Sequence, residues 1–148
     1  MSLPKIAVTM GDPAGVGPEV CLHLLQDEEI ARLCTPVVFG DAAVLDQAAV
    51  QCRLAKPDKV VAGLGEADAP CVLDIGEIGP GDFETGTVNA ATGRAGYTYV
   101  EDAINAALSG QVAAVTTAPL NKEALHAAGM LLYAWFTWAP AAADTGIQ

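Results

Sequence analysis

The stretch that decides the fold is TMGDPAGVGPE, residues 9–19. The residues just before its glycines, 5–10, are apolar and partly β-branched, which predicts a short buried strand. Pro18 stands where the first residue of a helix is expected, and apolar residues follow at 20, 21, 24 and 25, at helical spacing. The sequence therefore predicts a strand, a glycine-rich loop and a helix in succession.

The same alternation continues along the chain. Short apolar runs predict further strands at residues 36–39, 59–62, 71–75 and 112–116. Helices are expected after Asp41, from about residue 89 or 92 to 108, and from Asn121 to about 129, with Asp41 and Asn121 as caps. Strands that alternate with helices indicate an α/β fold with mainly parallel pairing.

Composition and charge exclude several classes of protein. The chain has 148 residues, is 52% hydrophobic and carries a formal net charge of −11. Seven basic residues are too few and too scattered for a surface that follows nucleic-acid phosphates, so we expect no nucleic-acid partner. An acidic balance of this kind is typical of a soluble cytoplasmic protein.

The cysteines and the apolar segments indicate neither a zinc site nor a membrane span. The four cysteines contain no CxxC pair, and we interpret them as reduced, mostly buried thiols. The longest uncharged apolar stretch, 130–143, has 14 residues, fewer than the roughly 20 that a transmembrane helix needs.

The loop in residues 9–19 is the first candidate site. Its glycines follow the pattern G-x-x-x-G-x-G, which is neither the dinucleotide fingerprint nor a P-loop. Glycines let the backbone turn tightly and approach a ligand closely, and ligands of open α/β sheets bind at the carboxyl ends of strands. Gly11 and Asp12 are therefore candidate substrate- or cofactor-binding residues. The alternative is an ordinary turn in which Asp12 is solvated.

A second candidate is VTTAPLNKEAL, residues 115–125, where a strand again runs into a loop and a helix. Asn121 and Lys122 lie near the expected start of that helix, where an amide and a positive charge can attract an anionic group such as a phosphate. The alternative is that Asn121 only caps the helix and Lys122 is solvated.

A third segment, TVNAATGRAGY at residues 87–97, opens the long helix. Its Arg94 could reach a carboxylate or a phosphate, although a structural arginine on a helix flank is the simpler interpretation. His23 and His126 have no second histidine or carboxylate at ligand spacing, so we interpret both as structural. No Ser/His/Asp arrangement and no pair of acid–base carboxylates is evident.

Taken in order, the three segments resemble the landmarks of the 4-hydroxythreonine-4-phosphate dehydrogenase family, over residues 5–129. The resemblance implies an α/β/α fold like that of isocitrate and isopropylmalate dehydrogenases, with the active site in a cleft between two domains, in an enzyme that is a homodimer. It also implies oxidation of a phosphorylated hydroxy acid, 4-phosphohydroxy-L-threonine, with NAD or NADP and a divalent metal. Decarboxylation follows, in the synthesis of pyridoxal 5'-phosphate (vitamin B6).

The chain departs from the family after residue 129. Where the family continues with a Gly-His-Thr-Glu segment, residues 130–148 form an atypical aromatic tail that includes both tryptophans. We expect residues 1–129 to be the N-terminal part of the two-domain fold and the tail to result from a frameshift, a premature stop or a deletion in the gene, the alternative being an ordinary C-terminal helix. The family's metal histidines have no counterpart here. We therefore expect no metal ligands, no productive cofactor binding and no activity from this chain alone.

An incomplete domain leaves sheet edges and apolar faces uncovered, so we also expect poor solubility, oligomerisation or partial order. Two other functions remain open. A phosphate acyltransferase of related fold would also bind phosphorylated ligands in a cleft, although residues 11–19 argue against it. A non-catalytic remnant would instead use the aromatic tail to bind a partner.

Overall fold

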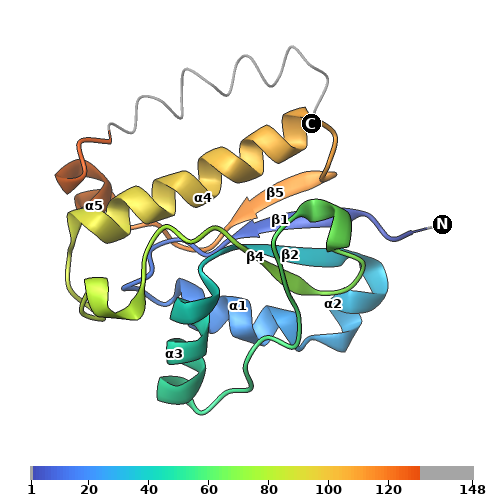
Figure 1. The fold of residues 1–148 in the computed structure, drawn as a ribbon, viewed down its shortest axis with the longest axis horizontal. Coiled ribbons are helices and arrows are strands. Elements are labelled where there is room, and N and C mark those ends of the chain that lie inside the picture. The colour runs from blue at the N-terminus through green and yellow to red at the C-terminus, as the bar shows by residue number, and fades with distance from the viewer. Residues whose placement is uncertain (1, 131–148) are drawn as a thin grey trace.

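The computed structural model describes residues 2–130, and its centre is a sheet of five parallel strands (Figure 1). The order across the sheet is β3-β4-β2-β1-β5, and every neighbouring pair is parallel. The strands are β1 (Lys5–Thr9), β2 (Thr35–Gly40), β3 (Val60–Val61), β4 (Cys71–Asp74) and β5 (Ala114–Thr117). The α/β fold expected from the alternating pattern is confirmed.

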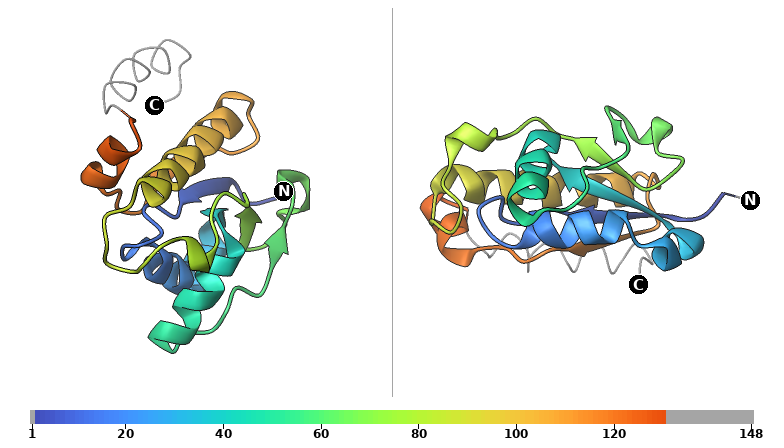
Figure 2. Two further views of the ribbon diagram at one scale, coloured as in Figure 1. Left: turned by 60° about the vertical axis from the view of Figure 1, so that its left-hand side comes forward. Right: turned by 90° about the horizontal axis from the view of Figure 1, so that it is seen from below.

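Helices cover both faces of this sheet. The long helix α4 (Ala90–Leu108) lies on one face, and α1 (Gly17–Leu25), α2 (Glu28–Leu33) and α3 (Ala42–Cys52) lie on the other (Figure 1). The last described helix, α5 (Lys122–Ala127), packs against the beginning of α4, as both views of Figure 2 show. Two short 3₁₀ turns, Leu64–Glu66 and Pro80–Asp82, lie in the connections on either side of β4. The expected α/β/α layering is thus present.

Strand β2 lies between the two helical layers, and all six of its residues are buried. Side chains alternate across a strand, so neighbouring residues face different layers. Asp41, next after β2, reaches Tyr99 on α4, whereas Gly40 faces the opposite layer and lies against the side chain of Met10. A continuous apolar sequence such as residues 35–40 is typical of a strand buried on both faces.

The outermost strand, β5, is different. Its only partner within residues 2–130 is β1, and three of its four residues are exposed while Val115 is half-buried. The outer edge of β5 therefore presents backbone N–H and C=O groups that no described strand pairs.

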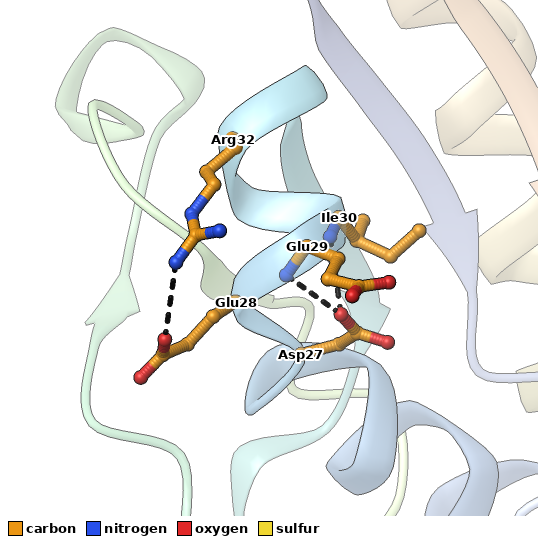
Figure 3. A network of polar contacts seen from close by, with 5 residues as sticks. All are labelled: Asp27, Glu28, Glu29, Ile30 and Arg32. Atoms are coloured by element: carbon orange, nitrogen blue, oxygen red, sulfur yellow. Dashed lines mark hydrogen bonds and ion pairs between the residues drawn. The ribbon is translucent and has the colours of Figure 1, made fainter.

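Helix α2 was not predicted from the sequence. Six residues long, it contains no buried residue. Its first turn is held by Asp27, whose Oδ1 accepts from the N–H groups of Glu29 (2.9 Å) and Ile30 (3.1 Å), as Figure 3 shows. An exposed ion pair between Glu28 and Arg32, 3.5 Å apart, lies on its surface (Figure 3). The cap, and not apolar spacing, defines this helix.

The predicted side-chain cap of α3 by Asp41 is wrong. Asp41 occupies the N-cap position, but its carboxylate turns inward and makes no capping bond. Instead Asp74, at the end of β4, accepts from the N–H of Ala42 at 3.0 Å. One of the unpaired N–H groups at the start of α3 is thus satisfied from a neighbouring strand, while the Asp41 carboxylate turns to the core.

The expectations for the cysteines and for a membrane span concern residues that the structure describes, whereas the expectation for the aromatic tail does not. All four cysteines are free thiols; Cys21 and Cys71 are buried, Cys34 is half-buried and Cys52 is exposed. The aromatic tail lies outside the described residues from position 131 onward. No helix within residues 2–130 has both the length and the apolar character that crossing a membrane requires.

Candidate functional site

The strand order places the first two candidate segments side by side. Strand β1 pairs with β2 on one edge and with β5 on the other, so the chain winds away from β1 in two directions. The loops that follow β1 and β5 both leave the sheet at its carboxyl edge. In open α/β sheets this reversal point is where ligands bind.

The two loops touch through their backbones. The Asp12 N–H donates to Pro119 O at 3.1 Å, and the Ala118 N–H donates to Thr9 O at 2.9 Å. Gly11 has a φ of +73°, and a Cβ at this position would lie 2.4 Å from Pro119 O. Only glycine fits there, because the position requires both a left-handed backbone and an empty side-chain volume.

The third candidate segment, residues 87–97, packs against these two loops. A Cβ on Gly96 would lie 3.2 Å from Gly11 O, and a Cβ on Gly93 would lie 2.0 Å from Ala124 O. The first turns of α4 therefore rest directly on the loop after β1 and on α5. The three segments that the sequence singled out as candidates form one contiguous region.

Asp12 is built into the loop and is not solvated. Its side chain is 5% exposed, and its Oδ1 accepts from the Ala14 N–H at 2.8 Å. Its main-chain oxygen accepts from the Gly15 N–H at 3.0 Å. The interpretation of a solvated Asp12 is therefore wrong: this carboxylate organises the turn from inside. Within residues 2–130, the Ala14 N–H is the only donor found for it.

Asn121 lies two residues after Pro119, and Lys122 is the first residue of α5. The Asn121 Oδ1 accepts from the N–H groups of Glu123 (2.9 Å) and Ala124 (3.1 Å), so Asn121 caps α5. Lys122 is exposed, and none of the ion pairs found among residues 2–130 involves it or Arg94, which is also exposed. The helix-cap interpretation of Asn121 is thus confirmed, while ligand binding by Asn121 and Lys122 stays a prediction.

A fourth segment, residues 75–89, completes the region; it connects β4 to α4 and overlaps the third candidate segment at residues 87–89. The Gly86 N–H donates to Ala14 O at 2.8 Å, which joins this segment to the glycine-rich loop. Beside that contact lies a pocket of about 330 Å³, between the loop, α1, α3 and residues 83–86. Apolar side chains such as Val44, Ala48 and Phe83 line much of it. The sequence singled out only one wall of this pocket, the glycine-rich loop, since the lining comes from four separate parts of the chain.

The segment 75–89 is anchored to the core by Asp41, which is 2% exposed. Asp41 Oδ1 accepts from the Glu77 N–H, and Oδ2 accepts from the Ile78 N–H, each at 2.9 Å. The Tyr99 hydroxyl on α4 donates to Oδ2 at 2.5 Å. The pKa of the Tyr99 hydroxyl lies well above its usual range, mainly because the hydroxyl is buried and secondly because the Asp41 carboxylate accepts its hydrogen bond. Tyr99 is therefore a protonated donor at neutral pH.

The part of the chain that the structure describes holds no group of three or more His, Cys, Asp or Glu side chains arranged for a metal ion. His23 and His126 are both exposed and lie on different helices, α1 and α5. The site at the carboxyl edge of the sheet thus offers backbone N–H groups, one buried carboxylate and exposed cations.

Comparison with known proteins places these features in a family. Residues 32–134 match the family model described as pyridoxal phosphate biosynthetic protein PdxA. A 4-hydroxythreonine-4-phosphate dehydrogenase of Trichlorobacter lovleyi is 38% identical over 131 residues, which are 85% of this chain and 39% of the relative. A protein of Symbiobacterium thermophilum assigned as a D-threonate 4-phosphate dehydrogenase is 39% identical over 132 residues, covering 84% and 38% of the two chains.

A solved structure gives the same result. The crystal structure of a 4-hydroxythreonine-4-phosphate dehydrogenase from Burkholderia phymatum superposes with a TM-score of 0.78 at 38% identity. The match covers 87% of this chain and 40% of that one. The chain therefore spans about two fifths of the length of the relatives it matches.

Proposed function

Because this chain belongs to the PdxA family of pyridoxal phosphate biosynthetic proteins, we propose that it forms one wall of a dehydrogenase active site for a phosphorylated hydroxy acid. The whole enzyme would oxidise 4-phosphohydroxy-L-threonine with NAD or NADP, and decarboxylation of the product would follow. D-threonate 4-phosphate, from the name of the second relative, is the other substrate of this class. The wall is residues 1–129, the N-terminal part of the two-domain fold.

One observation carries the proposal: the loops after β1 and β5 meet at the point where the strand order reverses. Lys122 supplies an exposed positive charge beside that junction, and Gly15 and Val16 expose the glycine-rich loop to an incoming ligand. A charge-assisted hydrogen bond from Lys122 to a phosphate oxygen would orient the substrate. Both relatives are named for substrates that carry a phosphate, which accords with a cation at this position.

The cofactors of the family are not accounted for by the described residues. Within residues 2–130 no cluster of metal ligands is present, so the divalent metal does not fit this part of the molecule. The glycine-rich loop also lacks the dinucleotide fingerprint. We assign the metal, the nicotinamide cofactor and the family's homodimer contacts to the rest of the full-length enzyme, and we expect residues 1–148 alone to be inactive.

The binding part of the proposal can be tested on this chain. In an NMR titration of the ¹⁵N-labelled protein with 4-phosphohydroxy-L-threonine, the amide signals of Gly15, Val16 and Lys122 should shift together. Lys122→Gln should weaken that binding about tenfold, because a hydrogen bond to a charged group is lost. Arg53→Gln, which removes an exposed cation at the end of α3, is the matched control and should leave binding unchanged.

The catalytic part needs a longer protein. Metal-dependent reduction of NAD or NADP with the same substrate should be absent from residues 1–148. It should appear when the chain is extended to the length of its relatives. Turnover by the 148-residue chain itself would overturn the proposal. Specific partner binding without any shift at Gly15, Val16 and Lys122 would favour a non-catalytic role.

A further inference from the structure

Hydrogen bonds hold segment 75–89 at two separate points, one in the core beside α4 and one on the glycine-rich loop. In the core, the Asp41 carboxylate accepts from the Tyr99 hydroxyl and from the N–H groups of Glu77 and Ile78. At the loop, the Gly86 N–H donates to Ala14 O at 2.8 Å. We propose that Asp41 and Tyr99, here called the Asp41–Tyr99 pair, are positioning residues that hold segment 75–89 against the glycine-rich loop.

The burial of the pair shows why it can act as an anchor. Tyr99 is 0% exposed and Asp41 is 2% exposed, so water does not compete for their hydrogen bonds. The Asp41 carboxylate accepts three protein donors, two from the main chain and one from a phenol. Removing one partner of a buried charged group costs more than removing a surface bond, because the remaining partner keeps its desolvation penalty.

Apolar packing holds parts of this segment, since Ile78 lies in the core and Ile75 and Phe83 pack against it, but hydrogen bonds hold it at few points. From Gly79 to Val88 no residue is fully buried. Among the described residues, Ile75 N–H to Gly40 O at 2.9 Å and the Asn89 cap of α4 lie at the ends of the segment, and Gly86 N–H to Ala14 O is the hydrogen bond that ties residues 79–88 to another part of the chain. Phe83, Thr85 and Gly86 line the pocket of about 330 Å³ beside the loop. The pair at one end of the segment and the Gly86 bond at the other therefore set the position of that pocket wall.

The consequence for ligand binding rests on the proposed function. Asp12 fixes the loop from inside by accepting from the Ala14 N–H, and Gly86 fixes it from outside by donating to the Ala14 carbonyl. Both constraints act on Ala14, next to the exposed Gly15. Loss of the outer constraint should let Gly15 and Val16 sample other orientations, which weakens ligand contact without removing any contacting group.

The test uses the full 148-residue chain and needs no ligand. Amide hydrogen exchange is measured by NMR in the unaltered protein and in Tyr99→Phe, which keeps the buried ring and removes only the hydroxyl. Exchange at Glu77, Ile78 and Gly86 should rise about tenfold or more, while the β1 and β2 amides, corrected for the change in global stability, stay unchanged. Tyr97→Phe on the same helix is the control, since no hydrogen bond of its hydroxyl is found within residues 2–130.

Two results would overturn the proposal. One is faster exchange at Ile78 with an unchanged exchange rate at Gly86, which would show that the pair is not coupled to the loop. The other is a uniform rise across the sheet, which would make Tyr99 only a core residue. If Tyr99→Phe does not fold, the unaltered chain decides: Glu77, Ile78 and Gly86 should open with one common urea dependence, and separate dependences reject the coupling. Failure of the phosphate-ligand titration would leave these results unchanged and would bear only on the proposed function.

Discussion

At the residue scale, three glycines are required because a neighbouring main chain occupies the space that a Cβ would fill. A Cβ added at each would lie 2.4 Å from Pro119 O at Gly11, 1.9 Å from Met10 O at Gly17, and 2.0 Å from Ala124 O at Gly93. The first two were noticed in the sequence, since they stand in a glycine-rich loop. Gly93 was not, because a glycine inside a helix carries no turn signal. Its role is visible only once α5 is seen against α4.

The first prediction concerns Gly93. Gly93→Ala would force α4 and α5 apart, and we expect a loss of about 3 kcal/mol in the free energy of unfolding, as for overpacked cores. Urea denaturation followed by circular dichroism measures it. Gly65→Ala is the control: no atom lies within 4 Å of the added Cβ and its φ is not left-handed, so a change within about 1 kcal/mol is expected. Equal midpoints for the two variants would refute the close contact of α4 with α5.

At the element scale, the strength of the sequence pattern decided what could be predicted. Strand β2 was predicted because burial on both faces requires an unbroken apolar run. Strand β5 was expected at 112–116 but lies at Ala114–Thr117. Val112 is buried, yet its N–H donates to Ala106 O at the end of α4 and not to the sheet. An apolar residue in the turn thus shifted the predicted strand by two positions.

The second prediction concerns α2, which has no buried residue and depends on its cap. Asp27→Ala removes two bonds to the first turn and should cost about 1 kcal/mol of local stability. Amide exchange at Glu29 and Ile30 reports it directly. Glu28→Ala, which removes the exposed ion pair with Arg32 and one of the two acidic residues of the first turn, should have the smaller effect, about threefold or less. The cap interpretation fails if the Glu28 variant has the larger effect.

The candidate site shows the same division between local and tertiary information. Gly11, Asp12, Asn121 and Lys122 were singled out because each follows an apolar strand and precedes a helix. The pairing of β5 with β1 that brings them together is a contact between residues more than 100 positions apart. No local pattern encodes such a contact, nor the inward turn of the Asp41 carboxylate that ties residues 75–89 to α4. Sequence motifs thus identified the individual residues of the candidate site, and the pairing of β5 with β1 brings those residues together.

At the scale of the whole molecule, burial makes the fold sensitive to alkali. Burial raises the pKa of the Cys21 thiol to about 12, and it also raises the pKa of Cys71 and of Tyr99. A group whose pKa is higher in the folded state keeps its proton when the unfolded chain has lost it. The contribution of Cys21 to stability should therefore be constant below about pH 9 and fall by about 1.4 kcal/mol per pH unit between about pH 9 and pH 12. Cys71 and Tyr99 should add to this alkaline decline in the same direction.

This third prediction is checked by urea midpoints measured between pH 7 and pH 10.5. In Cys21→Ala the free energy of unfolding should fall less steeply with pH, because the variant has no thiol to deprotonate at that position. Cys52→Ala, at an exposed thiol, should leave the slope as it is. A pH dependence that is the same in all three proteins would show that burial of Cys21 does not govern the alkaline limb.

The fourth prediction follows from the exposed edge of β5. Its sequence, Ala-Val-Thr-Thr, contains no charge, and proteins usually protect an edge strand with lysine, proline or a covering element. Within residues 2–130 nothing pairs with the outer edge, so we expect the chain to associate as its concentration rises. Sedimentation velocity measures this. Thr116→Lys should shift the equilibrium toward monomer by about tenfold, since a charge on the strand opposes edge-to-edge pairing.

The control separates edge pairing from net charge. Gln111→Lys adds the same charge to an exposed residue outside the strand, and at a starting net charge of −11 both variants reduce self-repulsion equally. If repulsion dominates, both substitutions will promote association; if the β5 edge dominates, only Thr116→Lys will oppose it. A soluble monomer with a sharp thermal transition would mean that the edge is not a liability.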